Sequence, residues 1–142
     1  MALLKTGAGA LALSGANTYT GNTTVSAGSL FINGSTASGS AVTVNNSGTT
    51  LGGSGAINGT INVASSGANL SPGASGVGST AILHTGALTL ASGSNFNVDL
   101  NSTTVGSGYD QVSVTSAVNL GGLLASNLVV TAGSNLSDQL CR

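Results

Sequence analysis

Short runs in which apolar and small polar residues alternate are the feature that most limits what this chain can fold into. The clearest runs lie at residues 30–32, 42–44, 61–63, 88–90 and 96–100. An apolar residue at every second position is the pattern of a β-strand with one buried face. Clusters of Gly, Asn and Ser separate the runs at intervals of about 8 to 12 residues, which is typical of an all-β protein.

Two all-β architectures fit this pattern, namely a sandwich or barrel and a solenoid of stacked coils. The phrase Ser-Gly-Ala-Asn recurs at 14–17 and 66–69, and like strands often lie 19 residues apart. Recurrence of this kind favours a β-helix, in which equivalent positions of successive coils stack into ladders. The spacing predicts roughly six or seven coils. One buried inward ladder is expected to contain Leu13, Ile32, Val44 and Val63.

Charge is scarce in this chain, since only 4% of its 142 residues are charged and the net charge is −1. The charged residues are Lys5, Asp99, Asp110, Asp138 and Arg142. Two cations do not neutralise a row of phosphates, so nucleic acid is not an expected partner. There is no run of 18 apolar residues that would predict a transmembrane helix. Cys141 is the single cysteine, so no intramolecular disulfide and no zinc site of several cysteines is expected.

Two carboxylates are the strongest candidates for chemistry. A glycosidase needs two acids within about 5 to 10 Å of each other, and Asp99 and Asp110 are near enough in sequence to lie within one coil. The simpler interpretation, which we favour, is that Asp99 ends a strand and Asp110 caps a turn. Asp138 belongs to no recognisable motif.

The remaining candidates are one histidine and two tyrosines, since the chain contains no glutamate. His84 has no nucleophile motif around it and is expected to be exposed. Tyr19 could stack on a sugar, but the favoured interpretation is that it packs over a turn beside Thr18 and Thr20. Tyr109 belongs to no motif either. We therefore predict no catalytic, cofactor-binding or metal-binding residues and no enzyme activity.

The segment 5–34 resembles a known family, the autotransporter-associated β-strand repeat, also called the passenger-associated transport repeat. The matching residues are Lys5, Gly7, Gly9, Leu11, Leu13, Ser14, Gly15, Asn17, Thr18, Tyr19, Thr20, Gly21, Thr23, Thr24, Val25, Gly28 and Leu30. The segment 109–122 is similar to sequences found just before the end of such passengers.

The resemblance implies a right-handed parallel β-helix carried to the bacterial cell surface, or secreted, by type V secretion. Its partner would be the outer-membrane barrel of the parent polypeptide. Residues 1–142 are expected to form a single β-helical passenger segment, with 71–80 as a loop between coils. Because the signal-peptide pattern is weak and no barrel sequence follows residue 142, the chain resembles a piece of a longer passenger.

Three functions are compatible with the sequence. The leading hypothesis is a non-enzymatic stalk that supports secretion and surface display, and the alternative is an adhesin that binds glycans or self-associates. A polysaccharide lyase is third. Acids gathered on one face would favour the enzyme, uniform polar ladders the stalk, and an exposed row of aromatic residues the adhesin.

Overall fold

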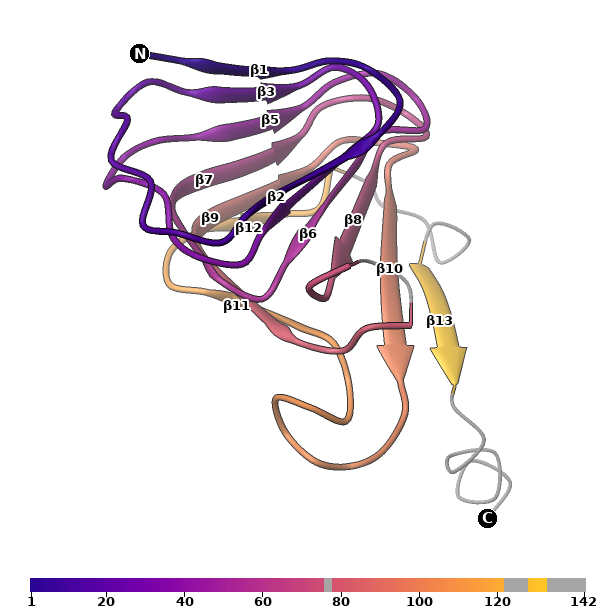
Figure 1. Ribbon diagram of the computed structural model, residues 1–142. Coiled ribbons are helices and arrows are strands. Elements are labelled where there is room, and N and C mark those ends of the chain that lie inside the picture. Colours follow the sequence, from indigo (N-terminus) through magenta and orange to yellow (C-terminus); the bar gives the residue numbers. More distant parts are fainter. Residues whose placement is uncertain (76–77, 122–127, 133–142) are drawn as a thin grey trace.

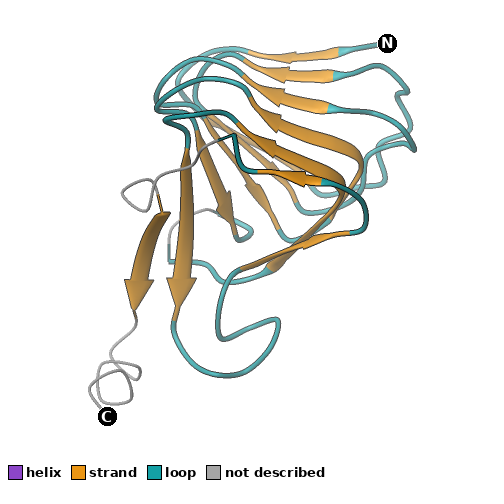
Figure 2. Ribbon diagram, turned by 180° about the vertical axis from the view of Figure 1, so that it is seen from behind, coloured by secondary structure: helices purple, strands orange, loops and turns teal. Residues whose placement is uncertain are grey.

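The computed structural model of the protein (Figure 1) describes residues 1–75, 78–121 and 128–132. Every regular element in these ranges is a β-strand, and Figure 2 shows strands and loops only. The strands are β1 (Leu3–Lys5), β2 (Ala10–Leu13), β3 (Thr23–Val25), β4 (Ser29–Ile32), β5 (Val42–Val44), β6 (Thr50–Gly53), β7 (Ala56–Val63), β8 (Asn69–Pro72), β9 (Ile82–Leu90), β10 (Asn95–Leu100), β11 (Gln111–Val114), β12 (Val118–Asn119) and β13 (Leu128–Ala132). These ranges contain no helix long and apolar enough to cross a membrane.

The strands form two sheets, and the chain passes from one sheet to the other as it advances. The first sheet has the order β1-β3-β5-β7-β9-β11, with β12 also paired to β9, and the second has the order β13-β10-β8-β6-β4-β2. All pairings between these strands are parallel. Each turn of the chain thus adds a strand to both sheets, as Figure 1 shows. The prediction of an all-β parallel β-helix is confirmed. The number of coils stays a prediction, because 122–127 and 133–142 lie outside the described residues.

Aliphatic ladders fill the space between the sheets. In the first sheet Val25 pairs with Val44, and Val44 with Val63, while in the second Leu30 pairs with Leu51. All of these side chains have no exposed surface. Full burial of an aliphatic side chain contributes about 1.5–3 kcal/mol, so the stacked ladders are the main source of stability.

The expected single ladder is wrong in one respect. The 19-residue spacing identifies true neighbours, because Leu13 pairs with Ile32 and Val44 pairs with Val63. These two pairs belong to different sheets, however, so they form two ladders that face each other. Leu13 is only half-buried, whereas the other three residues are fully buried. The reason is that, in the part of the chain that the structure describes, β2 is the last strand of its sheet and pairs with β4 alone.

The coils are longer in the second half of the chain. Strand β8 ends at Pro72, and the first sheet resumes at Ile82 in β9. After β8 the backbone turns back on β6, since the amide groups of Gly53 and Gly73 donate to each other's carbonyl oxygens at 2.9 and 3.0 Å. The expected loop at 71–80 is wrong at its start, because residues 71 and 72 belong to β8, and the described residues 73–75 and 78–80 lie in the connection to β9.

Neutral polar side chains link successive coils. The Ser40 hydroxyl donates to the Gly21 carbonyl at 2.7 Å, and the Asn58 amide donates to the Thr36 carbonyl at 2.7 Å. The amide of Asn95 donates to the side-chain oxygen of Asn69 at 3.0 Å. Hydroxyl and amide groups satisfy backbone groups at the corners without the desolvation cost of charges. This explains how the protein folds with so few ionised residues.

Candidate functional site

The two candidate carboxylates lie together and are both buried. Asp99 is near the end of β10 and is 3% exposed, while Asp110 directly precedes β11 and is 5% exposed. One oxygen of Asp110 accepts a hydrogen bond from the Ala81 amide at 2.9 Å, and the other accepts from the Asp99 amide at 3.0 Å. Asp99 itself accepts a hydrogen bond from the Gly78 amide.

These contacts correct the expected role of Asp110 as the cap of its own turn. Its carboxylate links the end of β10 to the residue before β9, which lies in the preceding coil. Both Asp110 oxygens are occupied by backbone donors, as is one oxygen of Asp99. Through these hydrogen bonds, Asp99 and Asp110 connect strand ends of the two sheets.

Burial raises the pKa of the Asp110 carboxyl above its ordinary value. The hydrogen bonds from the Asp99 and Ala81 amides act in the opposite direction, and the negative charge of Asp99 adds a smaller increase. A raised carboxyl pKa is found at catalytic sites and also in structural networks. Here the Asp110 carboxylate accepts hydrogen bonds from the backbone amides of Ala81 and Asp99, so it is part of a structural network.

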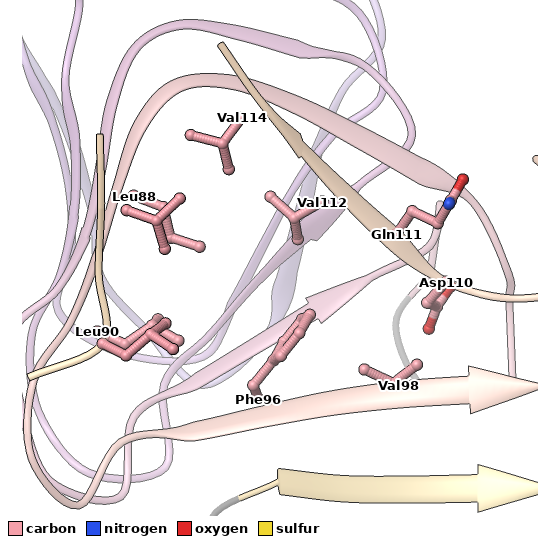
Figure 3. Close-up of a pocket in the computed structure, with 10 residues that line it drawn as sticks. Leu88, Leu90, Phe96, Val98, Asp110, Gln111, Val112 and Val114 are labelled. Atoms are coloured by element: carbon pink, nitrogen blue, oxygen red, sulfur yellow. The ribbon is translucent and has the colours of Figure 1, made fainter. Parts of the chain in front are cut away.

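Asp110 also borders a cavity of about 350 Å³ at the C-terminal end of the solenoid (Figure 3). We call this cavity the C-terminal mouth, and its lining residues are Leu88, Leu90, Phe96, Val98, Asp110, Gln111, Val112, Val114, Val118 and Leu120. Eight of these residues are apolar, and Figure 3 places the two polar ones, Asp110 and Gln111, at one side of it. Among the described residues, the cavity thus lies at the end of the hydrophobic interior.

His84 lies on β9 and is exposed, as the sequence predicted. It borders a separate hollow of about 150 Å³ together with Ile57, Asn58, Thr85, Gly86 and Thr115. This lining contains no carboxylate that would orient the imidazole as a general base. Within the described residues, no group of three or more His, Cys, Asp or Glu side chains comes together around one point.

Both tyrosines lie in the connections between strands. Tyr19 is half-buried, and its hydroxyl is 2.9 Å from the Thr23 hydroxyl, which connects the loop before β3 to that strand. This contact fits a residue that marks a coil corner. Tyr109 is half-buried and forms an antiparallel bridge with Leu100. Asp138 and Cys141 lie outside the described residues.

Lys5 is a buried residue whose position was not predicted. In β1 it pairs with Val25, so it occupies the position that Val25, Val44 and Val63 take in the coils that follow. Its ammonium group donates to the carbonyl oxygens of Thr6, Gly7 and Ala27 at 2.8 to 3.0 Å. A lysine that points inward from an edge strand discourages unwanted strand pairing. The register of β1 with β3 places Lys5 in the ladder of these valines. The alternation of Leu3 and Lys5 was the only sequence signal for this inward position.

Because the pKa of Asp110 is raised in the folded state, its contribution to stability depends on pH. Between its ordinary value of 3.8 and the folded value, the folded chain binds more protons than the unfolded chain. Stability from this group is therefore fully present below pH 3.8 and is lost as the pH rises through the folded pKa. We expect Asp110→Asn to remove this decline, measured by thermal unfolding of both proteins from about pH 3.5 to about pH 7.

The control for this experiment is Asp99→Asn. It removes only the smallest cause of the shift, so most of the decline with pH should persist. If the parent and Asp110→Asn show the same dependence of unfolding on pH, then Asp110 does not titrate with a raised pKa.

Stacked parallel coils around an aliphatic interior place the molecule among the parallel β-helix proteins. More specifically, residues 3–32 match the family model described as Passenger-associated-transport-repeat, a repeat of autotransporter passengers. The match begins at the first residue of β1 and ends at the last residue of β4, so it covers two strands of each sheet. It differs by two residues at each end from the segment 5–34.

No curated protein and no solved structure matches the chain. The repeat implies a protein that is secreted or displayed at the cell surface.

Proposed function

We propose that the chain is a non-enzymatic stalk segment of an autotransporter passenger, which supports secretion and surface display. The observation that carries this proposal is the match of β1 to β4 to the passenger repeat, followed by further coils of the same design. In a solenoid each coil contacts only its neighbours, so coils add one after another. Coil-by-coil folding outside the cell would help to draw the following chain outward.

The buried side chains support a structural function. The carboxylates of Asp99 and Asp110 bind backbone amides, and His84 borders a different hollow. Polar ladders, such as the one that Asn69 and Asn95 form at the starts of β8 and β10, are the feature that favours a stalk. The combination of low charge with neutral ladders also suits a polypeptide that crosses a narrow channel while unfolded.

The adhesin alternative has less support in its glycan-binding form. All four aromatic residues of the chain are described, and none is exposed: Phe31 is buried, and Tyr19, Phe96 and Tyr109 are half-buried. An exposed row of aromatic rings, the expected platform for sugars, is therefore not formed by these residues. Self-association, the other form of the alternative, does not depend on aromatic residues and stays a prediction.

A display assay tests the stalk. The chain is placed between an epitope tag and an autotransporter outer-membrane barrel, and the surface fraction of the tag is measured by antibody binding to intact cells. We expect efficient display of the parent, and several-fold less for Val63→Asp, because that change disrupts the stacked core. Asn62→Asp is the matched control, since it adds the same charge on the outer face of the same strand and should leave display unchanged.

Two results would contradict the proposal. One is equal display of the Val63→Asp and Asn62→Asp chains, which would separate folding of the coils from secretion. The other is release of reducing ends or unsaturated products from a glycan panel by the purified chain, if this turnover disappears in Asp99→Asn or His84→Ala.

A further inference from the structure

We draw no further inference here: the strongest candidate, the apolar C-terminal mouth between the last described strands of the two sheets, carries none, because nothing in the part of the chain that the structure describes shows what covers it.

Discussion

Replacing Val63 with Asp is expected to lower the free energy of unfolding by about 3–5 kcal/mol, because an unpaired carboxylate is placed inside the solenoid. Val63 has no exposed surface and pairs with Val44 on one side and Leu90 on the other. No described cation lies near this position, since Lys5 belongs to the first coil. For a chain of this length the loss corresponds to a fall in melting temperature of roughly 10–20 °C, measured by circular dichroism.

Asn62→Asp is the matched control for this change. Asn62 precedes Val63 in β7, is half-buried and pairs with Thr43, so its side chain belongs to the outer face. The same charge there faces water, and the expected effect is within about 0.5 kcal/mol. If Val63→Asp melts together with Asn62→Asp, the assignment of Val63 to the interior is wrong.

The second large effect is expected at the stacked glycines. Gly55→Ala should destabilise the fold by about 2–4 kcal/mol, because its Cβ would overlap the Gly34 carbonyl oxygen and the coils would have to separate. That oxygen accepts the hydrogen bond from the Ala56 amide at 2.8 Å, so separation also weakens the pairing between coils. Thermal unfolding measured at low protein concentration reports this loss.

Gly15→Ala is the control, and it should have the opposite sign. Its Cβ meets open space, and its backbone conformation is accessible to alanine. The unfolded chain loses conformational freedom, so we expect a gain of about 0.4–1 kcal/mol in the monomer. Equal destabilisation by Gly15→Ala and Gly55→Ala would show that coil-to-coil contact is not the reason for glycine in this stack.

Much of the fold could be predicted because a solenoid repeats the same local pattern. The alternation around Val44 and Val63 predicts strands, and the 19-residue spacing predicts their direct pairing, which the structure confirms. The spacing carries no information on which sheet a strand joins. Leu13 and Ile32 therefore entered the same predicted ladder as Val44 and Val63, although each coil contributes to two sheets.

The candidate site was predictable only in part. Sequence proximity allowed Asp99 and Asp110 to meet, and they do. The bond from the Ala81 amide to Asp110 was beyond prediction, because the lengths of two loops decide which backbone amide of the preceding coil faces that carboxylate. Burial of both acids follows from the same arrangement, and so does the raised pKa of Asp110.

The sequence by itself determined the strand period, the scarcity of charge and the passenger repeat, since each depends on composition or on residues that are close along the chain. Only the tertiary structure decided what each coil presents to its neighbours. Lys5 occupies a position that later coils give to valine, and Gly15 meets open space where Gly34 and Gly55 meet a carbonyl group. The physical reason is that, among the described residues, the first coil pairs with a coil on one side alone, so identical local patterns acquire different surroundings.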